Sequence, residues 1–220
     1  MEKTIQFQRP NLVGVIHTPE GFEVACAPGL DAVEIRVDAL ANPPSWEQIS
    51  NLPVPAIITV RHQDEGGAQA MTEEQRLARY LSLLPPAAAV DLEIRSATAM
   101  GDLITTVQRN RKTLILSFHD FDSTPPLSEL GEICETARGL GADIVKIAAK
   151  TETAGEVARL LMLLEEYRGP LAVMGMGTLG RASRMLFAKA GSALNYGWLD
   201  KPQVAGQWSA TEFAELLARA

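Results

Sequence analysis

Short runs of aliphatic residues recur along the chain, and segments with helical spacing of apolar positions separate them. Such runs are typical of buried strands, and their alternation with amphipathic segments predicts βα units and a parallel sheet. The eight predicted strands span residues 12–16, 32–38, 56–61, 89–94, 113–119, 143–148, 171–176 and 192–198. Eight strands close a βα barrel, so we expect an α/β fold, a single (β/α)8 barrel of the TIM type.

Signals for helix starts lie between the predicted strands. The residues expected to open the third, fifth, sixth and eighth helices are Thr72, Thr124, Thr151 and Ser209. The first and last of these have Gln or Glu three residues later, the spacing of a capping box, and Thr124 precedes a proline. No linker or low-complexity tract divides the chain, so residues 1–220 are interpreted as one domain. An open, doubly wound sheet stays an alternative, because periodicity alone does not exclude it.

Charged and polar residues interrupt several predicted strands. Strands of a parallel sheet are covered on both faces and normally read as continuous apolar runs. The interrupting residues are Glu34, Arg36, Asp38, Thr59, Arg61, Asp91, Glu93, Ser117, His119 and Lys146. In a barrel they converge inside, either as a plug of mutually neutralising ion pairs or as a site at the carboxyl ends of the strands. The variety of groups favours a site.

Lys146 points to a reaction class. It lies among aliphatic residues in the sixth predicted strand, where loss of hydration and nearby positive charges are expected to lower its pKa. A neutral amine condenses with a ketone to form a Schiff base. His119, whose type of side chain titrates near pH ~6.5, is suited to moving protons on the carbon beside the iminium. These residues predict Schiff-base catalysis.

In their order and spacing, the motifs resemble those of the type I 3-dehydroquinate dehydratases of the shikimate pathway. The matching segments cover most of the chain and are 33–38 (VEIRVD), 59–61 (TVR), 65–67 (EGG), 91–93 (DLE), 117–121 (SFHDF), 124–125 (TP), 142–148 (ADIVKIA), 174–176 (MGM), 183–184 (SR) and 206–207 (GQ).

The resemblance implies a single catalytic barrel domain, a lyase that removes water from 3-dehydroquinate to give 3-dehydroshikimate in aromatic amino acid biosynthesis, without a metal or other cofactor. It implies that Lys146 forms the imine, that His119 is the general acid and base, and that Glu65 orients His119. The substrate-binding residues that it implies are Glu34, Arg36, Arg61, Arg184, Gln203 and Gln207, with Arg184 on the substrate carboxylate. It also suggests a homodimer.

The chain departs from the family pattern before the last helix. Relatives often read Ser-Ala-Pro-Gly-Gln there, whereas residues 203–207 read QVAGQ. The polar contact of the serine is expected to pass to Gln203 or to be lost, and the absent proline leaves the loop more freedom. Val15 also stands where some relatives carry a serine.

Composition narrows the class of partners. Twenty basic and 27 acidic side chains give a net charge of −7, which excludes a nucleic-acid-coating surface. No apolar run approaches the ~18 residues of a membrane span, and the first ten residues are polar, so we expect a cytoplasmic protein without a membrane partner. Cys26 and Cys134 match no metal or redox spacing and are expected to be small buried residues.

Other motifs have competing interpretations. Residues 175–180 spell G-x-G-x-x-G, with Asp200 at the spacing of a dinucleotide fingerprint, but their place near the end of the chain favours a tight strand-to-helix turn. Lys150 is a rival nucleophile, expected beyond the strand end. His17 and His62 are expected to be loop histidines near the mouth of the barrel.

Two other functions stay open. A class I aldolase uses the same imine chemistry on the same type of barrel, and fold alone does not separate the two. A barrel that binds a shikimate-type ligand without turnover is the second, and the retained lysine and histidine argue against it.

Overall fold

Eight parallel strands form the centre of the molecule in a computed structural model that describes residues 5, 10–204 and 206–219. The strands are β1 (Asn11–Ile16), β2 (Ala32–Arg36), β3 (Ala56–Thr59), β4 (Ala89–Glu93), β5 (Thr113–Asp120), β6 (Ile144–Lys150), β7 (Leu171–Met176) and β8 (Leu194–Trp198). Their order is β7-β6-β5-β4-β3-β2-β1-β8, and Ala193, directly before β8, donates its N–H to Leu171 O of β7 at 2.8 Å. The predicted barrel is confirmed, and the doubly wound alternative is wrong.

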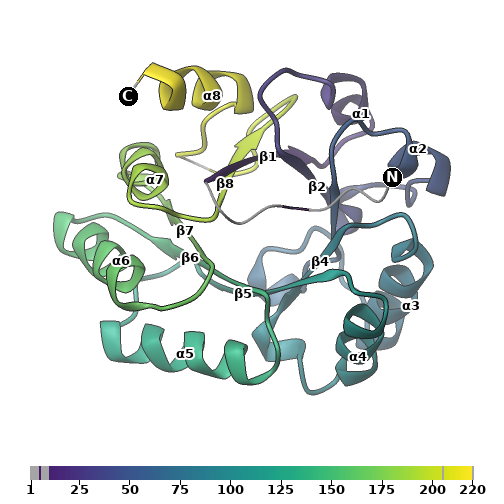
Figure 1. Cartoon of the computed structure of the whole chain (residues 1–220), viewed down its shortest axis with the longest axis horizontal. Helices are drawn as coiled ribbons and strands as arrows, with labels where there is room; N and C mark the ends of the chain where they lie inside the picture. The colour runs from purple at the N-terminus through teal and green to yellow at the C-terminus, as the bar shows by residue number, and fades with distance from the viewer. Residues whose placement is uncertain (1–4, 6–9, 205, 220) are drawn as a thin grey trace.

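Helices surround the strands (Figure 1). They are α1 (Glu20–Val24), α2 (Trp46–Ser50), α3 (Glu73–Leu83), α4 (Gly101–Arg109), α5 (Leu127–Gly139), α6 (Ala154–Glu166), α7 (Gly180–Lys189) and α8 (Ala210–Arg219), with 3-10 turns at Val37–Ala39, Gln63–Glu65 and Ile94–Ser96. In the described ranges, no helix combines the length and apolarity that crossing a bilayer requires.

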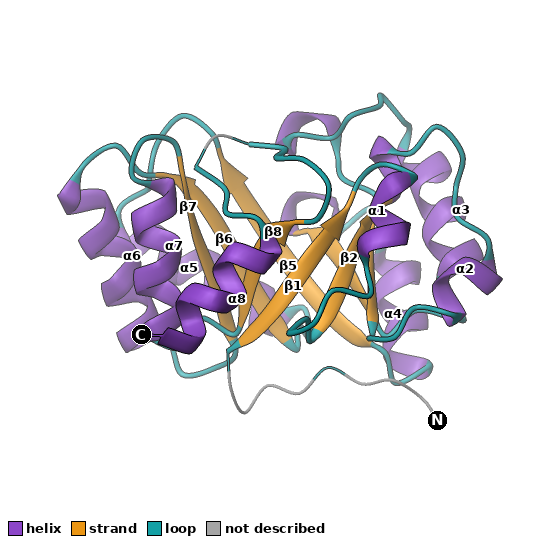
Figure 2. Cartoon of the chain, turned by 90° about the horizontal axis from the view of Figure 1, so that it is seen from above, coloured by secondary structure: helices purple, strands orange, loops and turns teal. Residues whose placement is uncertain are grey.

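The alternation of side chains along each strand builds two apolar layers and one polar layer. Val145 and Ile147 face outward into the core between strands and helices, whereas Ile144 faces the lumen with Ile57, Ala89 and Ile115. Residues two positions further along each strand lie on the same face, one level higher. The polar layer consists of Glu34, Thr59, Asp91, Ser117, Lys146 and Tyr196, so an apolar floor lies beneath it. Because the strands are parallel, their carboxyl ends lie at the same end of the barrel (Figure 2).

The predicted helix starts are partly confirmed. Thr72 forms a capping box with Gln75, and Ser209 Oγ accepts from the N–H of Glu212 at 3.1 Å. Thr124 and Thr151 were wrongly assigned as caps. Their hydroxyls instead bond to carbonyls of neighbouring strand ends, and Thr153 caps α6 while α5 begins at Leu127.

Three further expectations need correction. The strand β2 ends at Arg36, so Asp38 lies in the following 3-10 turn. The strand β6 runs to Lys150, two residues further than predicted, because it continues pairing with β7. Cys134 is buried as expected, but Cys26 is exposed, since it lies in the turn after the short helix α1.

Candidate functional site

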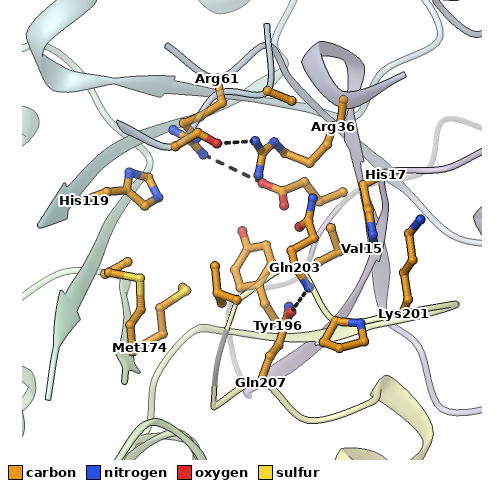
Figure 3. Close-up of a pocket in the computed structure, with 18 of the residues that line it drawn as sticks. Val15, His17, Arg36, Arg61, His119, Met174, Tyr196, Lys201, Gln203 and Gln207 are labelled. Atoms are coloured by element: carbon orange, nitrogen blue, oxygen red, sulfur yellow. Dashed lines mark hydrogen bonds and ion pairs between the residues drawn. The ribbon is translucent and has the colours of Figure 1, made fainter. Parts of the chain in front are cut away.

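A cavity of about 810 Å³ opens at the carboxyl ends of the strands. All nine predicted site residues line it: Glu34, Arg36, Arg61, Glu65, His119, Lys146, Arg184, Gln203 and Gln207. Figure 3 shows His119 and Met174 on one side of the cavity and Val15 and His17 on the other. The barrel thus brings together residues from both halves of the chain.

Lys146 lies at the bottom of the cavity and is 3% exposed. Its Nζ donates to Asp91 Oδ2 at 2.6 Å and to Glu34 Oε1 at 3.2 Å, and it lies 4.2 Å from the centroid of the Tyr196 ring. Two carboxylates and an aromatic face thus surround the side-chain nitrogen. The amino-acid sequence predicted positive charges near Lys146, but its closest partners are Asp91, Glu34 and Tyr196, which come from other strands.

Arg61 completes a buried network of charges with Asp91. Its Nη2 lies 3.1 Å from Asp91 Oδ2, and its Nη1 donates to Glu93 at 2.9 Å and to Ser117 Oγ at 2.7 Å. Burial alone would raise the pKa of Asp91, but Arg61 and Lys146 outweigh burial and hold this pKa well below its usual range. Asp91 therefore stays ionised between two cations.

His119 and Glu65 form a second pair beside Lys146. The Nδ1 atom of His119 lies 2.9 Å from Glu65 Oε2, and the backbone N–H of His119 donates to the same oxygen at 3.1 Å. Burial, assisted by the charges of Arg61 and Lys146, lowers the pKa of His119 well below 6.5. Burial also raises the pKa of Glu65 to about 7, against the effect of Arg61. Once Glu65 is ionised, above its raised pKa, its carboxylate accepts Nδ1–H from a neutral imidazole, which then keeps a lone pair on Nε2 to accept a proton.

Phe121 adds an apolar cover to this pair. Its ring stacks on the His119 ring at a centroid distance of 6.5 Å, and a Cβ at Gly66 would lie 2.8 Å from the Phe121 ring. The absence of a side chain at Gly66 therefore lets the ring approach the pair.

Arg184 is a buried cation that projects from α7 into the cavity. Its Nε donates to Gly175 O at 3.0 Å and its Nη1 to Tyr196 O at 3.2 Å. Across residues 5, 10–204 and 206–219, no carboxylate lies within ion-pair distance of this guanidinium. Burial lowers the pKa of Arg184 to about 10, which leaves it charged at neutral pH. It is therefore suited to an anionic ligand, above all a planar carboxylate.

Arg36, Gln203 and Gln207 lie on the upper wall. Arg36 makes a two-pronged contact with Asp38, at 3.0 and 2.8 Å, and donates to Gly66 O at 2.9 Å. The backbone N–H of Gln203 donates to Gln207 Oε1 at 3.1 Å (Figure 3). Gln203 lines the cavity, and the transfer of the serine's polar contact to it stays a prediction. Ala205 lies outside the described residues.

The structure shows where the glycine motif at 175–180, Asp200 and Lys150 lie. Gly177 has a φ of 82° and accepts from the N–H of Gly180 at 3.0 Å, so the glycine motif forms the tight turn between β7 and α7. Asp200 accepts from Thr18 Oγ1 at 2.7 Å. Lys150 is a strand residue outside the lining of the cavity. The dinucleotide interpretation is wrong because the motif ends the seventh strand of a barrel.

Sequence reasoning missed several residues of the pocket. Tyr196 lines the cavity from the lumen face of β8, and the alternation that placed Asp91 and Lys146 inside could have found it. His17 is a loop residue near the mouth of the barrel, as expected: it follows β1 directly, is 9% exposed and lines the cavity. Its environment depends on Asp200, which is 183 positions away, and no local pattern signals that contact.

Comparisons with known proteins agree with this geometry. A family model described as "Type I 3-dehydroquinase" matches residues 20–219. A 3-dehydroquinate dehydratase of Methanocella arvoryzae is 33% identical over 201 residues, which cover 90% of this chain and 91% of that protein. A solved 3-dehydroquinate dehydratase of Aquifex aeolicus superposes with a TM-score of 0.84 at 27% identity, over 95% of this chain and 98% of the other. The chain therefore belongs to the type I 3-dehydroquinase family.

Proposed function

We propose that this protein catalyses the dehydration of 3-dehydroquinate to 3-dehydroshikimate through an imine on Lys146. The observation that carries the proposal is the placement of Lys146, His119 and Arg184 around one cavity, with the guanidinium of Arg184 lacking a carboxylate partner in the described chain. The substrate is inferred from the names of the relatives. In the cavity, Lys146 offers an amine, His119 a base and Arg184 a cation, which suit a hydroxylated keto acid.

The proposed steps balance as the loss of one water. The amine of Lys146, after losing a proton, attacks the ketone carbon, and water leaves to form the iminium. His119 then takes a proton from the carbon beside the iminium carbon. The same histidine returns a proton to the hydroxyl on the next carbon, which leaves as water and creates the double bond. A second water hydrolyses the iminium and releases the product and Lys146.

The surrounding residues support each step. Glu65 fixes the ring of His119 through Nδ1, which leaves Nε2 for the substrate proton. Arg184 binds the carboxylate and so orients the ring of the substrate. Glu34, Arg36, Arg61, Gln203 and Gln207 contact the hydroxyls or shape the pocket. The Lys146 ammonium must exchange its contact with Asp91 for the substrate carbonyl, so Asp91 determines how readily the amine is released.

Trapping of the imine tests the proposal. The protein is incubated with 3-dehydroquinate and borohydride, and intact mass and peptide mapping locate the adduct, while a parallel assay measures 3-dehydroshikimate. We expect the adduct on Lys146, its loss in Lys146→Ala and its retention in Lys150→Ala. An adduct on Lys150 would overturn the site. Smaller carbonyl fragments in place of 3-dehydroshikimate would indicate an aldolase. The absence of both the adduct and the product would favour a barrel that binds a ligand without turnover.

Three expectations about the whole protein remain proposals. We propose one catalytic domain over residues 1–220, a homodimer, and a cytoplasmic enzyme that acts on a small molecule and not on nucleic acid. Sedimentation equilibrium of the full chain tests the dimer, since a monomer mass at micromolar concentration would contradict it.

A further inference from the structure

Two polar atoms, one on a cavity-lining residue and one just behind it, lie near each other without a hydrogen-bond partner in the described chain. They are Nδ1 of His17 and Oδ1 of Asp200, both buried, and they lie 3.8 Å apart. This distance is about 1 Å longer than a charge-assisted hydrogen bond. Buried polar atoms are nearly always paired, so an unpaired donor and acceptor in mutual reach form an incomplete contact.

The two residues belong to different elements. His17 follows the carboxyl end of β1, and Asp200 lies near the start of the stretch between β8 and α8 (described residues 199–204 and 206–209), here called the β8–α8 loop. Asp200 Oδ2 already accepts from Thr18 Oγ1 at 2.7 Å, so one oxygen holds the loop to β1 and the other is available to His17. Contact with His17 would therefore attach the loop at a second point.

The same loop carries Gln203 and Gln207, which line the cavity. Figure 3 shows His17, Val15 and Lys201 along the wall next to Gln203. A shift of the loop that brings Asp200 to His17 would also move the two glutamines relative to the pocket. His17 follows β1, but its contact with Asp200 would couple it through the loop to Gln203 and Gln207.

The pKa of His17 lies below its ordinary value, and burial is the largest cause. Burial lowers the pKa of His17, and the charges of Lys201 and Arg36 act in the same direction, whereas Asp200 and the backbone of Val15 raise this pKa. A shorter distance to Asp200 would strengthen the raising effect of this carboxylate on the pKa of His17.

We propose that His17 is a positioning residue: its Nδ1–H closes on Asp200 Oδ1 when substrate occupies the cavity and fixes the β8–α8 loop with Gln203 and Gln207 against the ligand. The inference rests on the proposed function for the identity of the substrate. It predicts that His17 contributes to substrate affinity more than to the chemical step, which Lys146 and His119 perform.

Histidine NMR tests the pair without any activity. The chain has three histidines, so selective isotope labelling gives three ring signals, with His62 as the internal reference. In Asp200→Asn, the pKa of His17 should fall by about one pH unit, because the neighbouring negative charge is removed, while that of His62 stays constant. A His17 pKa unchanged by this substitution would refute the pair, whether or not the protein turns over 3-dehydroquinate.

Kinetics test the positioning role. His17→Phe keeps a ring but removes the donor, and we expect KM for 3-dehydroquinate to rise about tenfold with a smaller change in kcat. His17→Asn places an amide N–H near the position of Nδ1 and should restore most of the affinity. Equal KM values in wild type and His17→Phe, or a loss in kcat alone, would overturn the role. If wild-type protein shows no turnover, the proposed function fails and the NMR titration alone decides the pair.

Discussion

The Nζ atom of Lys146 lies 2.6 Å from Oδ2 of Asp91, and this one carboxylate serves both buried cations of the lumen, since Arg61 approaches the same oxygen at 3.1 Å. Both cations are shielded from bulk solvent, because Lys146 and Arg61 are 3% and 2% exposed. The ion pair therefore couples the stability of the barrel to Lys146, the proposed nucleophile.

Replacement of Asp91 should destabilise the fold. Asp91→Asn leaves two buried cations short of one negative charge, which costs about 3–5 kcal/mol and lowers Tm by roughly 10 °C. Thermal unfolding followed by circular dichroism measures this effect. Asp102→Asn, at an exposed position in α4, is the matched control and should change Tm by little. Equal Tm values for the two variants would show that the network contributes no stability.

Removal of the proposed base should separate imine formation from proton transfer. We expect His119→Gln to lower kcat by ~10² to 10⁴-fold while borohydride still traps the substrate on Lys146. His62→Asn, which keeps an acceptor at the N-cap of the neighbouring 3-10 turn, should retain its rate. A steady-state assay gives kcat, and mass spectrometry after borohydride treatment gives the amount of trapped adduct. An undiminished kcat in His119→Gln would remove His119 from the mechanism.

The charge of Arg184 should determine affinity for the carboxylate. Arg184→Met is expected to raise KM on the order of 100-fold, and Arg184→Lys to recover part of that loss because a lysine lacks the two-pronged geometry. Arg181→Met removes an exposed arginine three residues earlier on α7, which contacts the Trp208 ring, and should leave KM near its wild-type value. Similar KM values for Arg184→Met and Arg181→Met would mean that the carboxylate binds elsewhere.

The raised pKa of Glu65 predicts a pH-dependent stability. The folded state holds the proton up to about pH 7, whereas the ordinary value is 4.5, so between these limits the folded state binds more protons and loses stability as pH rises. Relative to Glu65→Gln, the free energy of unfolding of wild type should fall by about 3 kcal/mol from pH 4.5 to above 7. Urea unfolding across this range measures the difference. A constant difference would mean that Glu65 titrates normally.

Part of the active site was readable from the strands themselves. Because side chains alternate along a strand, the amino-acid sequence alone was enough to place the charges at Glu34, Asp91 and Lys146 in the lumen. The predicted strand starts were accurate to within two residues, since apolar runs depend on local burial. Strand ends were less accurate, as at Lys150, because pairing with the next strand determines where a strand stops.

The amino-acid sequence by itself determined the eight βα units, the family, and which residue types face the lumen, because these depend on periodicity and on motifs within a few residues of each other. Only the tertiary structure decided how those residues pair. The contact of Lys146 with Asp91 spans 55 positions and that of Thr18 with Asp200 spans 182, and closure of the barrel creates both. Electrostatic environments follow from such distant contacts, so the protonation states of Glu65, His119 and His17 became readable only in the folded barrel.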